Sequence, residues 1–431
     1  MKPGAENAKS IVWGISPWTG LWSMGEHKGT PSYYYSLAGL ANAGHEIHLY
    51  ALNDGVSKTE EVYEGIYIHR FKVPLEKQIR ALQGIVGRIK YLGFIGTGLL
   101  QLLYVSLYML AAIRRARREG KKARPSLIYA YSSYSAPAAY ILGRLYHMPN
   151  ITRLFGTFIT SRDRSSHLRL LLKWQEVLAF KLPCKYLIVT NDGTQGNKVA
   201  QKLGVPAERL KFWRNGVDKG MYDPNFDIDE FKRGLGLKSS DKIVLTASRL
   251  AGWKRLERLI KAVPSVVSQR KDVVFFIVGD GPEREKLERL SLDLGANGYV
   301  RFVGAVTHEK VASHMNAADV FVSVNDFGNV SNGLYEAMVC GKCIVVLEGG
   351  DTGQLIQDNL TGRLIKTGDE EEINGELSKA IIDVLEDDEL KTRLGNNARI
   401  YAQQHFQTWQ ERIEMEVKLI QELADKEGKV K

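Results

Sequence analysis

The stretch Val324–Asp351, VNDFGNVSNGLYEAMVCGKCIVVLEGGD, decides how the fold is interpreted. It overlaps a short β-branched run at 319–324, which predicts a buried strand. A loop rich in Asn, Gly and Ser follows, residues 334–339 have helical character, and Gly341 suits a left-handed helix end. Residues 342–347 are again apolar and predict a second buried strand before a Gly-rich turn. The stretch therefore predicts a strand, a polar loop, a short helix, a strand and a glycine turn.

The polar loop before the predicted helix is a candidate anion site. A helix N-terminus presents free backbone N–H groups and the positive end of the helix dipole, which suits a diphosphate. Asn329 and Asn332 would add amide donors, and Glu336 is placed to accept from sugar hydroxyls. An ordinary capped helix with a surface Glu fits the same spacing, so both interpretations stay open.

This stretch resembles the donor-site segment of the retaining glycosyltransferases of the GT-B fold, in particular family four. Many members carry a Glu, seven residues, and a second Glu followed by Ala-Met and Gly; residues 336–338 and Gly341 match the second half. The first Glu would fall at Gly328. The sequence instead resembles a subgroup with the motif Asp-x-x-Asn-x-x-Asn-x-x-x-Glu, which is matched by Asp326, Asn329, Asn332 and Glu336. The resemblance makes Asp326 the candidate for the work of the missing carboxylate.

The chain has 431 residues, which implies two or three domains, and a formal net charge of +10. Much of the positive charge is local, because residues 77–124 contain eleven Lys and Arg against one acid, Glu119. Such clustering indicates a polyanionic partner or a solvated helix face. We expect no nucleic acid, because there is no stacking-aromatic or recognition-helix signature. A phosphorylated substrate and a peripheral contact with an anionic membrane both fit this charge.

Three cysteines show no metal-ligand spacing with histidines. The odd count in a large chain argues for reduced thiols, and the N-terminal residues MKPGAENAKS lack the apolar core of a signal peptide. We therefore expect a cytoplasmic protein without a metal site.

The N-terminal half predicts a parallel α/β domain. Strands at 10–15 and 46–52 flank a helix at 33–43, and ligands bind beyond the carboxyl ends of such strands. The resemblance implies that Gly29 and Thr30, in the loop after the first strand, lie against the donor. Further strands are predicted at 126–130 and 150–155. Many members have a histidine near residues 155–156, where this chain has none, and the polar alternatives on the acceptor side are Arg153, Thr157 and Tyr131.

Residues 77–113 allow three interpretations. An amphipathic helix is predicted at 78–90, and residues 91–113 contain no charged residue. The uncharged segment fits a helix buried against the sheet, an interfacial helix docked on anionic lipid, or a transmembrane span. Residues 162–180 predict one further amphipathic helix.

The C-terminal half opens on a strand at 242–247, followed by Arg249 and Lys254 and a helix at 256–262. Arg binds two phosphate oxygens at once and Lys supplies a point charge, so the pair suits a diphosphate. The resemblance places both against the donor diphosphate, with Arg255 as a solvent-facing neighbour. Strands at 273–278 and 300–303 follow, and a terminal helix is predicted at 409–423. The implied donor-binding set also includes Gly279, Gly304, Gly333 and Thr352.

The whole chain thus predicts a GT-B fold, with two Rossmann-like doubly wound parallel-sheet domains facing across a cleft. We expect an acceptor-binding domain at 1–218, onto which part of the helix 407–425 packs back, and a donor-binding domain at 219–406. Residues 215–218 resemble the signature at the crossing between the domains.

The implied activity is hexosyl transfer with retention, independent of metals and cofactors. The donor would be a UDP- or GDP-linked sugar. The acceptor would be a lipid-linked or cell-surface glycan precursor at the cytoplasmic face of the membrane, as in polysaccharide biosynthesis. The missing histidine and first Glu motivate an alternative, a nucleotide-sugar-binding protein with impaired catalysis.

Overall fold

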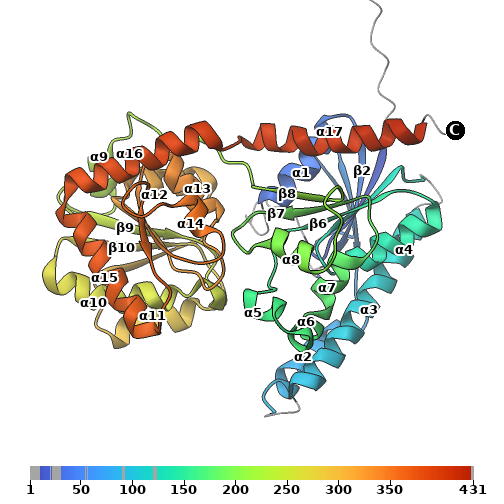
Figure 1. The fold of residues 1–431 in the computed structure, drawn as a ribbon, viewed down its shortest axis with the longest axis horizontal. Helices are drawn as coiled ribbons and strands as arrows, with labels where there is room; N and C mark the ends of the chain where they lie inside the picture. The colour runs from blue at the N-terminus through green and yellow to red at the C-terminus, as the bar shows by residue number, and fades with distance from the viewer. Residues whose placement is uncertain are drawn as a thin grey trace, which may run out of the picture. The chain divides into compact units, whose positions relative to one another are not determined.

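The computed structural model describes residues 10–19, 21, 31–53, 55, 57–89, 93–119 and 124–428 (Figure 1). The chain forms two compact α/β units. Unit 1 comprises residues 1–190, 196–214 and 410–431, and unit 2 comprises residues 191–195 and 215–409. The main division in the sequence thus lies between residues 214 and 215, the short segment 191–195 belongs to unit 2, and nearly all of the C-terminal helix belongs to unit 1.

Unit 1 is built on an eight-stranded sheet in the order β3-β4-β2-β1-β5-β6-β7-β8. All neighbouring strands are parallel except β3, which runs antiparallel to β4. The central strands are buried almost throughout, as expected for strands with helices on both faces. The strands are β1 (Ile11–Ile15), β2 (Glu46–Leu52), β3 (Glu60–Tyr63), β4 (Ile66–Phe71), β5 (Leu127–Tyr131), β6 (Asn150–Leu154), β7 (Tyr186–Thr190) and β8 (Leu210–Trp213).

The helices of unit 1 include three short ones where the sequence predicts a single helix at 162–180. That prediction is wrong because the chain contains local caps: the Thr160 side chain forms a capping box with Asp163, and the Ser166 side chain accepts from the Arg169 N–H. The helices are α1 (Pro31–Asn42), α2 (Glu76–Val86), α3 (Gly93–Glu119), α4 (Ala136–Tyr146), α5 (Ser161–Arg164), α6 (His167–Leu172), α7 (Trp174–Lys181), α8 (Gly196–Lys202) and α17 (Trp409–Gly428).

The uncharged segment 91–113 was compatible with a buried helix, an interfacial helix or a transmembrane span, and the packing of α3 bears on that choice. It packs against β2, β4 and α4, and buries Tyr104, Tyr108 and Ala112 on one face. Its residues 96–119 are long and apolar enough to cross a membrane, yet only 22% of that apolar window is buried inside the protein. One face of α3 is therefore core, its flanks are partly buried, and the opposite face is open.

Unit 2 is built on six parallel strands in the order β11-β10-β9-β12-β13-β14. The predicted strands at 242–247 and 273–278 have the observed bounds, whereas β14 is short and was not predicted. The chain moves outward from β9 to β11 and then returns to the other side of β9, so the sheet has a switch point between β9 and β12. The strands are β9 (Lys242–Ala247), β10 (Val273–Val278), β11 (Val300–Gly304), β12 (Val320–Ser323), β13 (Cys343–Leu347) and β14 (Arg363–Ile365).

The strands of unit 2 bury alternate side chains in two apolar clusters, one on each face of the sheet. Val244 and Val345 pack with α10 and α15, while Leu245 and Ile344 pack with α13 and α16. The helices are η1 (Lys219–Met221), α9 (Ile228–Gly234), η2 (Gly252–Lys254), α10 (Leu256–Gln269), α11 (Arg284–Asp293), α12 (His308–Ala317), α13 (Asn332–Val339), α14 (Thr352–Leu355), α15 (Glu370–Glu386) and α16 (Asp388–His405). Both units are thus doubly wound α/β layers.

Candidate functional site

The switch point of the unit 2 sheet fixes where a ligand would bind. In open parallel sheets the crevice lies beyond the carboxyl ends of the strands at which the strand order reverses. Here those strands are β9 and β12. The loop after β9 contains Arg249 and Lys254, and the loop after β12 leads into α13. The residues predicted to bind the donor diphosphate therefore follow the two strands that flank this crevice.

Glycines let the loops around β9 approach one another closely. Gly279, after β10, has φ of 129°, and its N–H donates to the Gly304 carbonyl at 2.8 Å. A Cβ at Gly279 would lie 1.9 Å from the Ser248 carbonyl oxygen. These contacts require a glycine at residue 279 whether or not a ligand binds there. Donor binding by Gly279 and Gly304 stays a prediction.

The two predicted phosphate-binding cations differ in their surroundings. Arg249 is exposed and makes no ion pair with the described residues. Lys254 is 8% exposed, and its Nζ lies 4.2 Å from the centre of the Trp253 ring. Burial lowers the pKa of Lys254 to about 8, against the opposing effect of the Asp192 carboxylate. A buried ammonium with no carboxylate within 4 Å among the described residues is costly unless an anion binds beside it.

Asp326 is engaged in an arginine–carboxylate cluster. Its carboxylate lies 3.2 Å from Arg255 and 2.9 Å from Arg258, and both arginines also pair with Glu370. The Asp326 N–H donates to the Trp253 carbonyl at 3.2 Å. Asp326 thus ties the loop after β12 to the segment that contains Lys254. The prediction that Arg255 faces solvent is corrected, because its guanidinium makes three ion pairs.

Two predicted donor-binding side chains instead hold the loop before α13 together. The fully buried Asn329 accepts from Ser323 Oγ at 2.8 Å and donates to the Leu347 carbonyl at 2.7 Å. Thr352 Oγ1 accepts from the Asn329 N–H at 3.0 Å and donates to the Gly349 carbonyl at 2.6 Å. Because these polar groups are already paired, we reassign both side chains from ligand donors to loop supports.

The first turn of α13 lies against the end of β9. A Cβ at Gly333 would be 2.8 Å from the Ala247 carbonyl oxygen, so this close approach needs glycine. Asn332 accepts from Asn215 Nδ2 at 2.9 Å. Glu336 is half-buried, and burial, with the Asp218 charge, raises its pKa to about 7. No described group donates a hydrogen bond to its carboxylate. Such a group suits the hydroxyls of a bound ligand.

The structure explains why the first motif Glu is absent. The corresponding residue, Gly328, packs on Gly193 of the segment 191–195, and a Cβ there would lie 2.2 Å from the Gly193 carbonyl carbon. A Cβ at Gly350 would lie 1.7 Å from the Gly193 carbonyl oxygen. No side chain fits at residue 328 in this arrangement. Sequence reasoning missed this segment, although its Asn-Asp-Gly pattern after a strand was a detectable loop signal.

The acceptor-side predictions in unit 1 need correction. Arg153 and Tyr131 are fully buried. The Arg153 guanidinium pairs with Glu416 at 2.8 Å, and the Tyr131 hydroxyl lies 3.2 Å from Ser36 Oγ. These two side chains belong to the core and are closed to an acceptor. Thr157 donates to Glu176 at 2.6 Å. Gly29 and Thr30 lie outside the described residues.

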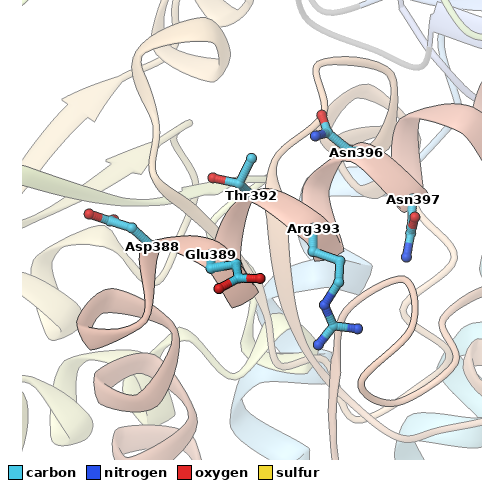
Figure 2. A pocket seen from close by; sticks show the side chains of 6 residues that line it. All are labelled: Asp388, Glu389, Thr392, Arg393, Asn396 and Asn397. Carbon is cyan, nitrogen blue, oxygen red and sulfur yellow. The ribbon is translucent and has the colours of Figure 1, made fainter.

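Two other features do not join the predicted site. A surface hollow runs along α16 (Figure 2), and it is lined by Asp388, Glu389, Thr392, Arg393, Asn396 and Asn397, none of which was predicted to bind a ligand. In unit 1, one potential metal-ligating atom from each of Glu60, His69 and Glu119 lies within 4.8 Å of the others. Arg115 already pairs with both of these glutamates and offsets part of their negative charge.

Comparisons with known proteins agree with this geometry. The family model described as Glycosyltransferase Family 4 matches residues 29–220, and the one described as Glycosyl transferases group 1 matches residues 227–401. The chain belongs to the GT4-type glycosyltransferases. The HepE protein of Anabaena, solved in complex with UDP and glucose, has a similar fold, with a TM-score of 0.65 and 21% identity over 95% of this chain and 99% of HepE. The fold is therefore GT-B.

Two curated relatives match this GT4-type chain at about 30% identity over shorter stretches. An uncharacterized glycosyltransferase of Methanocaldococcus jannaschii is 31% identical over 44% of this chain and 47% of its own length. The GDP-mannose-dependent α-(1-6)-phosphatidylinositol monomannoside mannosyltransferase of Mycolicibacterium smegmatis is 30% identical over 48% of this chain and 55% of its own length. The chain thus spans about half of the length of these two relatives.

Proposed function

We propose that this protein transfers a sugar from a nucleotide-diphosphate sugar to an acceptor, with retention of the anomeric configuration and without a metal ion. The donor diphosphate binds beyond β9 and β12 of unit 2. Arg249, Lys254 and the backbone N–H groups at the start of α13 stabilise the charge that develops on the leaving diphosphate. Glu336 accepts hydrogen bonds from the ribose hydroxyls and anchors the donor.

The observation that supports this proposal most strongly is the buried, unpaired Lys254 at the switch point of the sheet. Its burial lowers its pKa, and the described carboxylates do not pair with it. A dianionic diphosphate would compensate that ammonium while also meeting the exposed guanidinium of Arg249. Since the positive groups are in place before the reaction, they would stabilise the leaving group without reorganisation.

For the acceptor, we propose a lipid-linked sugar or cell-surface glycan precursor at the cytoplasmic face of the membrane. The basic and apolar segment 77–124 supports this choice. So does the likeness to the mannosyltransferase of M. smegmatis, whose name gives phosphatidylinositol monomannoside as acceptor. That relative's name gives a GDP-sugar, whereas HepE was solved with UDP, so the proposal leaves the base of the donor to experiment.

A thermal-shift panel of UDP-, GDP- and ADP-sugars tests the donor site. A ligand that binds only the native state raises the melting temperature once its concentration exceeds its dissociation constant. We expect one nucleotide to stabilise the wild-type protein and to lose most of that effect in Glu336→Ala. Glu348→Ala serves as the control, since this exposed Glu follows β13 and lies outside the proposed set.

The outcomes separate the proposal from its rival. Absence of a shift with every donor, in the presence and absence of lipid, would refute the donor site. A donor-specific shift together with release of free nucleotide and a glycosylated lipid supports transfer. A donor-specific shift without transfer to any lipid or glycan acceptor would favour the catalytically impaired binding protein that the missing histidine suggests.

A further inference from the structure

Helix α3 presents one open face that combines leucines with arginines. Its exposed apolar side chains are Leu99, Leu102, Leu103 and Leu110, at 63%, 47%, 44% and 52% exposure. Arg114 and Arg117 are exposed further along. The spacing from Leu103 to Leu110, Arg114 and Arg117 is seven, four and three residues, so these four share one helical face. The two arginines make no ion pair with the described residues.

Helix α2 and the turn after it carry exposed apolar side chains as well. Figure 1 shows α2 beside α3 at one end of unit 1, and the two helices are tied by the Gln83–Gln101 hydrogen bond of 3.0 Å. The exposed apolar residues of α2 and its following turn are Leu82, Ile85 and Ile89, at 47%, 62% and 50% exposure. Arg88, next to Ile89, is exposed as well. Seven large apolar side chains thus lie open on one helical hairpin.

Seven exposed apolar side chains with arginines nearby, on two helices in contact, have a specific chemical match. Soluble monomers rarely expose large contiguous apolar patches, and such patches mark interaction sites. A second protein would need complementary carboxylates for the arginines, whereas an anionic bilayer supplies both acyl chains and phosphates over an unlimited area. The net charge of +10 favours the same partner.

We propose that the α2–α3 hairpin docks unit 1 on an anionic phospholipid surface, with α3 lying in the plane of the interface. The inference deepens the proposed function, since it states how the enzyme would reach a lipid-linked acceptor. The opposite face of α3 is core, with Tyr108, Ala112 and Ala116 fully buried, so the helix does not span the bilayer in this fold. Arg114 lies about 16 Å along the axis from Leu103, so only a flat helix brings both to the headgroup layer.

Vesicle flotation of the full-length protein tests the docking surface. The probes are vesicles of phosphatidylcholine alone and of an equimolar mixture with phosphatidylglycerol. We expect the wild-type protein to float with the mixed vesicles, to float poorly with phosphatidylcholine, and to detach as KCl is raised. Leu99→Ser/Leu103→Ser should weaken the binding to mixed vesicles at least tenfold. Arg114→Gln/Arg117→Gln should weaken it roughly tenfold and reduce its dependence on salt.

Leu292→Ser is the matched control, because Leu292 is a 62% exposed leucine on α11 in unit 2. It should float like the wild-type protein. Each variant should retain the wild-type circular dichroism melt and the donor-induced thermal shift, which separates failure of docking from failure of the donor site. Equal flotation with both vesicle types, or unchanged flotation of Leu99→Ser/Leu103→Ser, would overturn the proposal. So would a lipid-free dimer that these serines dissociate, because the surface would then be an interface between two copies.

Discussion

Two arginine–carboxylate clusters, one in each unit, use the same chemistry in opposite surroundings. In unit 1, Arg153 and Arg412 pair with Glu416, and the exposed fraction of all three side chains is at most 1%. In unit 2, Arg255 and Arg258 pair with Asp326 and Glu370, whose side chains are 34% and 45% exposed. The first cluster fastens α17 to the sheet of unit 1, and the second joins the loop after β12 to the first turns of α10 and α15.

The difference in burial predicts a difference in role. A buried carboxylate loses its hydration and needs every partner it has; Glu416 also accepts from Tyr129 at 2.6 Å and from Ser36. Part-exposed ion pairs are worth little stability, because water and salt screen them. We therefore expect the cluster of unit 1 to contribute mainly to the free energy of folding. We expect the cluster of unit 2 to fix the position of the loop after β12. The predictions below test that division.

The largest effect should come from Glu416→Gln. The change leaves Arg153 and Arg412 buried without their anion, which should cost about 3–5 kcal/mol of folding free energy. Urea unfolding followed by circular dichroism measures it. Glu414→Gln, at an exposed position of the same helix, should stay within about 0.5 kcal/mol of the wild type. A loss below about 1 kcal/mol in Glu416→Gln would remove the distinction between the two clusters.

Lys254→Ala should lower turnover by about two orders of magnitude or more, the scale seen for loss of one transition-state donor. Stability should not fall, because removing a buried ammonium without an ion pair relieves a desolvation cost. The measurement is steady-state transfer from the nucleotide sugar found in the thermal-shift panel. Lys261→Ala, an exposed lysine of α10, is the control. Turnover of Lys254→Ala within threefold of the wild type would reject this assignment.

Asp326→Asn should lower turnover by about tenfold with less than about 1 kcal/mol of lost stability. The reason is positional: the change weakens the bridge from the loop after β12 to the segment that contains Lys254. Asp326→Glu should recover part of the activity, since it restores the charge. Glu370→Gln changes the same cluster from α15 and leaves the bridge intact, so its turnover should stay within threefold of the wild type. Equal losses in Asp326→Asn and Glu370→Gln would contradict a bridging role.

The strands of unit 2 were predictable because they are short apolar runs bounded by polar residues or glycine, as at 242–247 and 273–278. The resemblance pointed to Lys254 and Glu336, which lie in the segment after β9 and in α13, and their donor-binding roles stay predictions. Burial was not predictable in the same way. Arg153 follows the pattern of a polar residue at a strand end, yet its partner Glu416 is more than two hundred residues away in sequence, and no local pattern reveals such a pairing.

The loop supports show the same limit. Asn329 and Thr352 have the residue types that bind phosphates, but the same amide and hydroxyl groups also satisfy buried backbone carbonyls. Only the fold decides which of the two tasks they perform. Likewise, the sequence shows that residue 328 is not a Glu. The steric reason is the contact with Gly193, which lies far away in the sequence, and no local pattern reveals that contact.

The smallest predicted effect is a pH dependence that contrasts Glu336 with Glu416. Burial raises the pKa of both carboxyls in principle, but Arg153 and Arg412 more than offset it at Glu416, whose pKa is lowered from 4.5. Glu416 therefore contributes stability above about pH 4.5 that is lost as the pH falls through its lowered pKa. Glu336, with a pKa of about 7, binds more protons in the folded state, so it makes the protein less stable as the pH rises from 4.5 to 7.

The same pKa values predict the activity. The free enzyme needs an ionised Glu336 to accept from the ribose and a protonated Lys254 to bind the diphosphate. With pKa values of about 7 and about 8, kcat/KM should be bell-shaped, and it should fall roughly two- to threefold from pH 7.5 to pH 6.5. In Glu336→Gln the acid limb should vanish at a lower overall rate, while the alkaline limb stays. An unchanged acid limb in this variant would show that another group titrates there, and Glu336 would then have no part in donor binding.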